Sequence, residues 1–112
     1  MKPIALFAAL TLIALPVFAE TQEAGLAALQ ELGRFNGQSL ACSQLSFSGK
    51  AKALMIQHAP KTRRHGEVFE EATNAAFLEQ GKTPESCPTA SDFANRLSAL
   101  SARLQAALPA MQ

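Results

Sequence analysis

The sequence contains one concentration of basic side chains that could bind an anion: Lys61, Arg63, Arg64 and His65. From residue 50 to residue 65 there are five Lys and Arg and no acid, whereas residues 67–79 contain four acids and no Lys or Arg. Backbone N–H groups at a helix start favour anions, and guanidinium groups bind them in bidentate geometry. The pattern therefore predicts a site for phosphate, sulfate, carboxylate or an acidic peptide. The alternative is a solvated surface on which Arg63 pairs with Glu67 one turn on.

The same segment offers incomplete sets for metal binding or catalysis. His58 and His65 are seven residues apart, with Met55 and Glu67 nearby, but this is not a zinc ligand set and no haem attachment motif is present. His65 with a following glutamate, and a serine among Ser43, Ser46 and Ser48, have no spacing that defines a nucleophile and its base. We expect no metal, no cofactor and no enzymatic activity.

Cys42 and Cys87 are the only cysteines, 45 residues apart. In an exported protein an isolated pair usually forms a disulfide, and a loop of this length predicts about 4 kcal/mol of stabilisation by chain entropy. A redox pair is the alternative, but there is no C-x-x-C motif. The spacing favours a structural disulfide between Cys42 and Cys87.

Residues 1–19 have the pattern of a cleaved signal peptide. Lys2 precedes an apolar run from Ile4 to Phe18, and small side chains occupy the positions that a signal peptidase reads before Glu20. A membrane anchor is the alternative, but about 20 apolar residues are needed to cross a bilayer. The residue directly after the predicted cut is Glu20 and not a cysteine, so a lipid anchor on an N-terminal cysteine is not expected. We expect a periplasmic or secreted protein without membrane insertion.

The predicted mature chain, residues 20–112, carries no net charge. Lys2 is the only one of the ten Lys and Arg that the cut removes, which leaves nine cations against nine acids. There is no basic excess for nucleic acid, and no Trp or Tyr to stack on bases. We expect one small domain that does not bind nucleic acid.

Hydrophobic periodicity predicts four helices, at residues 22–34, 39–58, 60–80 and 89–108. Thr21 is the expected N-cap of the first helix, and Gly33 with Asn36-Gly37 its expected end. Thr89 with Asp92 resembles a capping box for the last helix. The predicted fold is an all-α, up-down bundle of about four helices stapled by one disulfide.

The segment LACSQL, the block from residue 59 to 81 and Cys87-Pro88 resemble a group of small secreted, two-cysteine helical proteins of Gram-negative bacteria, over residues 26 to 108. In architecture the chain is also similar to the periplasmic acid-stress chaperones of the HdeA type, which are helical and carry one disulfide. It departs from these chaperones in its sequence motifs and in lacking Trp.

These observations favour a protein that acts by binding a protein partner or an anionic ligand. The resemblance implies one alternative, an acid-stress chaperone that exposes its Leu and Phe seams when acid loosens the bundle. A second alternative is an immunity or inhibitor protein that blocks a partner enzyme. The oligomeric state does not follow from the sequence.

Overall fold

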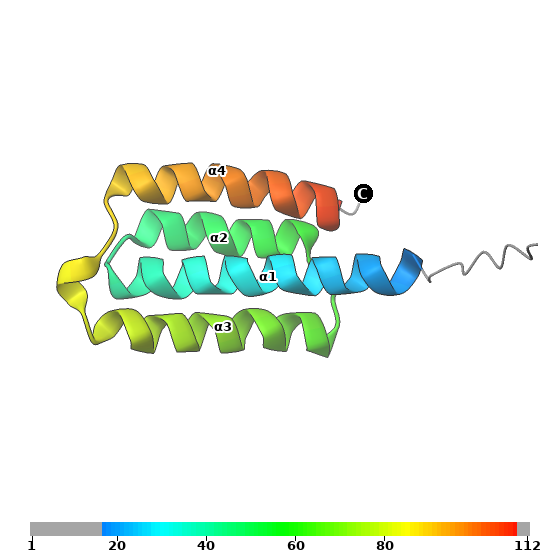
Figure 1. Cartoon of the computed structure of the whole chain (residues 1–112), viewed down its shortest axis with the longest axis horizontal. Helices are drawn as coiled ribbons and strands as arrows, with labels where there is room; N and C mark the ends of the chain where they lie inside the picture. Colours follow the sequence, from blue (N-terminus) through cyan, green and yellow to red (C-terminus); the bar gives the residue numbers. More distant parts are fainter. Residues whose placement is uncertain (1–16, 110–112) are drawn as a thin grey trace, which may run out of the picture.

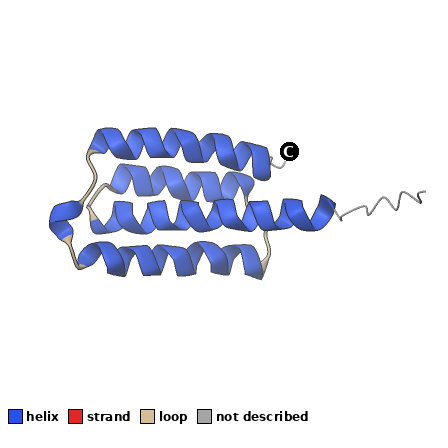
Figure 2. Ribbon diagram, in the orientation of Figure 1, coloured by secondary structure: helices blue, strands red, loops and turns tan. Residues whose placement is uncertain are grey.

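The computed structural model describes residues 17–109 as a bundle of α-helices (Figures 1 and 2). The elements are α1 (Val17–Ala41), α2 (Leu45–His58), α3 (Arg63–Gly81), the 3-10 helix η1 (Pro84–Ser86) and α4 (Ala90–Ala107). Helices α1 and α3 run in one direction, and α2 and α4 run in the other (Figure 1). The predicted all-α, up-down bundle of four α-helices with one disulfide is confirmed.

The first helix is longer than predicted, and the second begins later. Helix α1 continues through Gly33 and Gly37 to Ala41, and Thr21 lies inside it rather than at its start. The turn to α2 comes at Ser43, whose φ of 59° is in the left-handed region. The predicted range 39–58 placed Cys42 in the first turns of the second helix, which was wrong, because Cys42 directly follows α1.

Gly33 and Gly37 stay helical because they allow α3 to approach the backbone of α1. A Cβ atom at Gly33 would lie 2.5 Å from the carbonyl oxygen of Phe69, and one at Gly37 would lie 2.1 Å from that of Thr73. Glycine in a helix interior costs about 1 kcal/mol relative to alanine. Packing of α1 on α3, the most extensive contact between two helices here, offsets that cost.

Two threonines set the starts of the other long helices. Thr62 caps α3, which begins at Arg63 and not at Pro60 as predicted. Thr89 accepts a hydrogen bond of 3.1 Å from the backbone N–H of Asp92, as the capping pattern predicts. Helix α4 then ends at Ala107, before Pro109.

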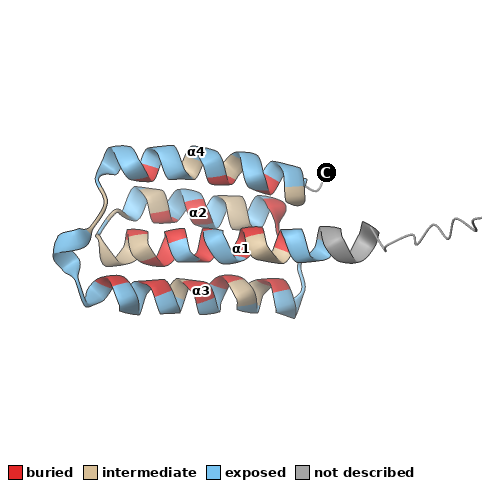
Figure 3. Ribbon diagram, viewed as in Figure 1, coloured by how far each residue is buried: buried red, intermediate tan, exposed pale blue. Residues whose placement is uncertain are grey.

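The core lies where α1, α2 and α4 meet, and α3 covers another side of α1. Phe35 of α1 and Phe93 of α4 are fully buried, and Phe47 of α2 packs against both rings. Figure 3 shows the buried residues of α3 on its side toward α1, and Phe69 and Ala72 are among the buried residues of this helix. Because α3 packs mainly on α1, a hollow remains on each side of α3.

Most of the predicted signal peptide, residues 1–19, lies outside the described residues. Only its last three residues are described, and they form the beginning of α1. Among residues 17–109, no helix has the length and apolar character to cross a membrane.

Candidate functional site

Of the four residues predicted to form an anion site at the start of α3, the structure leaves three exposed and buries the fourth. Lys61, Arg63 and Arg64 are exposed, but His65 is only 5% exposed. The backbone N–H of His65 donates to Thr62 Oγ1 at 3.2 Å, and its ring Nδ1 lies 2.6 Å from the same oxygen. Three cations therefore remain exposed at the start of α3. The ring and the backbone N–H of His65 instead make contacts with Thr62 inside the protein.

Among the residues that the structure describes, neither histidine is grouped with other metal-binding side chains. His58 is buried, and its Nδ1 lies 2.5 Å from the carbonyl oxygen of Leu108, which joins the end of α2 to the end of α4. Within residues 17–109 no three His, Cys, Asp or Glu side chains are grouped as metal ligands.

One of the three serines considered as nucleophiles, Ser48, has a structural contact instead. It is 2% exposed and donates to Asn36 Oδ1 at 2.6 Å. Asn36 Nδ2 in turn donates to Thr73 Oγ1 at 3.2 Å. These hydrogen bonds connect α2, α1 and α3, so the buried polar groups hold the helices in register.

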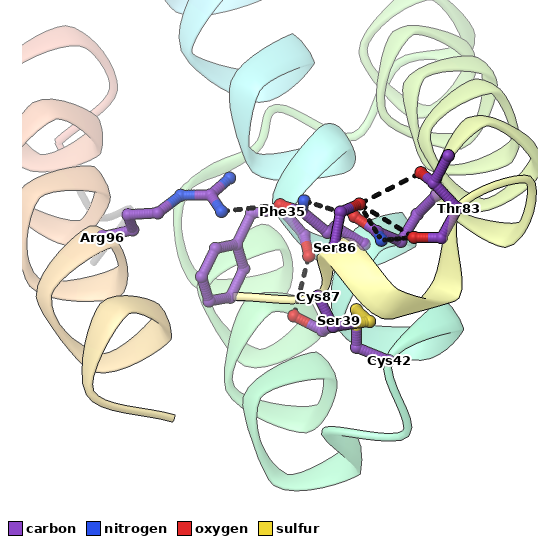
Figure 4. Close-up of a disulfide and its surroundings, with 9 residues drawn as sticks. Phe35, Ser39, Cys42, Thr83, Ser86, Cys87 and Arg96 are labelled. Atoms are coloured by element: carbon purple, nitrogen blue, oxygen red, sulfur yellow. Dashed lines mark hydrogen bonds between the residues drawn. A yellow bond between two sulfur atoms is a disulfide. The ribbon is translucent and has the colours of Figure 1, made fainter. Parts of the chain in front are cut away.

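The predicted disulfide between Cys42 and Cys87 is confirmed. It joins the end of α1 to the segment between η1 and α4, with the two Cα atoms 5.8 Å apart (Figure 4). No cysteine is free. The bond therefore fixes η1 and the start of α4 against the end of α1.

Next to the disulfide, a chain of side-chain hydrogen bonds crosses from η1 to α4. Gln80 Nε2 donates to Ser86 Oγ at 3.2 Å and to the carbonyl oxygen of Thr83 at 3.0 Å. Gln38 Nε2 donates to Gln80 Oε1 at 2.7 Å, and Arg96 Nη1 donates to Gln38 Oε1 at 2.6 Å. Figure 4 shows this chain between Ser86 and the guanidinium of Arg96. The position of Arg96 thus depends on a segment that the disulfide holds.

Arg96 is also held by aromatic rings. Its Cζ lies 5.6 Å from the centroid of Phe35 and 5.8 Å from that of Phe93. Cation–π contacts of this kind fix a guanidinium without neutralising its charge. A guanidinium has five N–H donors, and the contact with Gln38 uses one of them. Arg96 is therefore oriented, and it retains donors for a ligand.

Two more arginines lie near Arg96, and both have carboxylate partners. Arg103 pairs with Glu31, and Arg34 lies 3.6 Å from Glu79 in a pair whose side chains are more than half exposed. Within the described part of the chain these are the two ion pairs, and neither includes Arg96. We call the surface formed by Arg34, Arg96 and Arg103 the arginine face.

The arginine face is hollowed. A hollow of about 350 Å³ between α1 and α4 is lined by all three arginines and Glu31, and a second of about 250 Å³ reaches toward η1. Arg34 and Arg96 line both hollows. A third, of about 300 Å³ between α1 and α3, contains Arg34 and Arg64. Arg64 is thus the predicted site residue that shares a hollow with the arginine face.

Sequence reasoning missed the arginine face because its residues are distant in the sequence. Arg34 is separated from Arg96 by 62 positions, and only the packing of α4 on α1 brings them together. The available signal was the spacing of seven between Arg96 and Arg103, which places both on one side of a helix.

The comparisons with known proteins give no relative: no family model, no curated protein and no solved structure matches this chain.

Proposed function

We propose that this is an exported binding protein that captures an acidic group of its partner, a carboxylate or a phosphate, at the arginine face. One observation carries the proposal. The guanidinium of Arg96 is held by Gln38 and two phenylalanine rings, and among the described residues it has no carboxylate partner. A cation that is already oriented loses less conformational entropy on binding an anion.

The neighbouring groups support bidentate recognition. Arg34 lines the same two hollows, and its contact with Glu79 is long and solvent-exposed. Exposed pairs of this kind contribute only about 0–1 kcal/mol, so a ligand can displace Glu79 at small cost. Arg34 and Arg96 together then offer two planar groups to one acidic partner.

Export is part of the same proposal. The disulfide between Cys42 and Cys87 supports an oxidising compartment, and the pattern of residues 1–19 supports removal of a signal peptide after Ala19. The protein then acts in the periplasm or outside the cell, where its partner is also found. The acidic group belongs to that partner, and the interaction requires no cofactor.

A chemical-shift titration of the purified, disulfide-bonded protein tests the site, with inorganic phosphate and a glutamate-rich peptide as separate ligands. We expect the side-chain amide of Gln38 and the resonances of Arg96 to move. Because a hydrogen bond to a charged group contributes about 1.5–3 kcal/mol, Arg96→Gln weakens binding tenfold or more. Arg96→Lys, which keeps the charge and loses the planar fork, weakens it less.

Arg63→Gln is the matched control, since it removes one exposed arginine from the other candidate site. We expect it to leave binding unchanged. Weakening by Arg63→Gln and not by Arg96→Gln would move the site to the start of α3, where Lys61 and Arg64 are its neighbours. Absence of any shift with either ligand would reject both sites.

A further inference from the structure

The groove between α2 and α3 is a second exposed feature, separate from the arginine face. It has a volume of about 560 Å³, and residues of α1 such as Asn36 and Leu40 form its floor. Met55 and Ile56 line it from α2, and Phe69 lines it from α3. The groove is open because the glycines of α1 hold α3 against α1 rather than against α2.

Large apolar side chains are exposed on the two helices that border this groove. On α2, Leu45 is 66% exposed and Ile56 is 72% exposed. They are eleven residues apart, which places them on one stripe of the helix. On α3, Phe77 is 46% exposed and lies seven residues after Glu70, which lines the groove. Helices α2 and α3 form the two rims of the groove, and both rims therefore present apolar surface that a partner would bury.

The two rims carry opposite charge. On α2 the charged residue at the groove is Lys52, because Lys50 lines a different hollow between α2 and α4, and on α3 the charged residue at the groove is Glu70. Lys52 and Glu70 line the groove from its two sides. Neither takes part in the ion pairs found within residues 17–109. Each rim is thus complementary to the opposite rim of an identical groove.

We infer that this groove is the interface between two copies of the chain, related by a two-fold axis parallel to the helices. This axis places α2 of each copy over α3 of the other, so that Lys52 meets Glu70 of the second copy twice. A two-fold axis across the helices would instead place α2 on α2, where only cations meet. Closed two-fold dimers are the commonest soluble assemblies, and their interface is self-complementary in this way.

Sedimentation equilibrium on single-charge variants, followed by mixing, tests the interface. We expect the natural protein to dimerise, and Lys52→Glu and Glu70→Lys each to be monomeric, because each creates two like-charge contacts across the dimer. Mixed in equal amounts, the two variants regain complementary contacts. Native mass spectrometry should then detect a heterodimer of Lys52→Glu with Glu70→Lys in excess of either homodimer.

Ile56→Glu and Leu78→Glu form a second matched pair. Ile56 lines the groove, whereas Leu78, 65% exposed, lies on the outer side of α3. We expect Ile56→Glu to abolish the dimer and Leu78→Glu to retain it. A monomeric natural protein, or a dimer whose charge variants show no preference for each other, would overturn the inference. The arginine face is not part of this groove, so the proposed function stands or fails separately.

Discussion

Gly33 and Gly37 determine how closely α1 and α3 approach each other. Without side chains there, the backbone of α1 meets the carbonyl oxygens of Phe69 and Thr73. The approach leaves Asn36, between the glycines, in reach of Ser48 on α2 and Thr73 on α3. One short segment of α1 therefore provides both the close packing and the buried hydrogen bonds of the bundle.

Gly37→Ala should destabilise the protein. The added Cβ would lie 2.1 Å from the carbonyl oxygen of Thr73 and 2.8 Å from the backbone nitrogen of Phe77, and backbone atoms cannot move aside as a flexible side chain can. Overpacking of this kind typically costs about 1–3 kcal/mol. The free energy of unfolding from urea denaturation measures the loss.

Gly49→Ala is the control for this substitution. Gly49 is also helical, but a Cβ there would meet nothing within 4 Å. Its replacement should raise the free energy of unfolding by about 0.4–1 kcal/mol, because alanine is the better helix former. Equal effects of the two substitutions would contradict the close approach of α1 and α3.

At the scale of the helices, the sequence predicted the number and type of the elements better than the residues at which they begin and end. The apolar spacing of α4 and the Thr89 cap are local signals, so that helix was predicted closely. The end of α1 was predicted wrongly because glycine can have two structural roles at this position. It can end a helix, or it can admit a neighbouring helix, and only the position of α3 decides between these.

The residues of the two candidate sites also differ in how far the sequence alone reveals them. The cations at the start of α3 are adjacent in sequence, so they could be recognised there. Arg34 and Arg96 come together only when α4 packs on α1, and the support from Gln38 depends on Gln80 of a third helix. Packing between helices that are distant in the sequence leaves no local pattern from which it could be predicted.

The disulfide should stabilise the bundle and also position the arginine face. Replacing both Cys42 and Cys87 by serine should lower the free energy of unfolding by about 2–5 kcal/mol. It also frees η1, whose Ser86 accepts from Gln80, and thereby loosens the hydrogen bonds that orient Arg96. We expect weaker binding of the glutamate-rich peptide even at temperatures where the variant is fully folded.

Urea denaturation and the peptide titration measure the two effects separately. Addition of a reductant to the natural protein should reproduce both, and it should leave the double serine variant unchanged. Stability that does not change on removal of the disulfide would show that the bond has no structural role.

Over the whole molecule, α1 contacts the other three helices and contributes to both exposed features. Its Arg34 belongs to the arginine face, and its Leu40 lies in the floor of the groove between α2 and α3. The predicted mature chain has as many acids as Lys and Arg. Recognition of an acidic partner must then come from the local arrangement of arginines and not from an overall positive field.

Export requires that the mature protein begin at Glu20. Removal of residues 1–19 takes only the first three residues of α1, and its buried residues such as Ala28, Leu32 and Phe35 are retained. The intact mass of the protein recovered from its natural compartment should match residues 20–112 with two hydrogens missing for the disulfide. A mass that includes Met1–Ala19, or a protein with two titratable thiols, would contradict export.

The response to acid separates the binding protein from the chaperone alternative. Acid protonates the nine carboxylates, which removes the negative partners of Arg34 and Arg103 and leaves about nine Lys and Arg charges to repel one another. We expect the bundle to loosen at about pH 3, with helicity retained and increased binding of a hydrophobic dye. We also expect binding of the glutamate-rich peptide to disappear, since its carboxylates are protonated as well.

A binding protein needs no activity in the loosened state, whereas a chaperone does. We therefore expect the acid-treated protein to leave the aggregation of an unfolded client unchanged, as measured by light scattering during neutralisation. The Cys42→Ser, Cys87→Ser double variant is a useful comparison, because it loosens at higher pH. If both proteins keep the client in solution, and the natural protein binds no acidic peptide at neutral pH, the chaperone alternative replaces the proposed function.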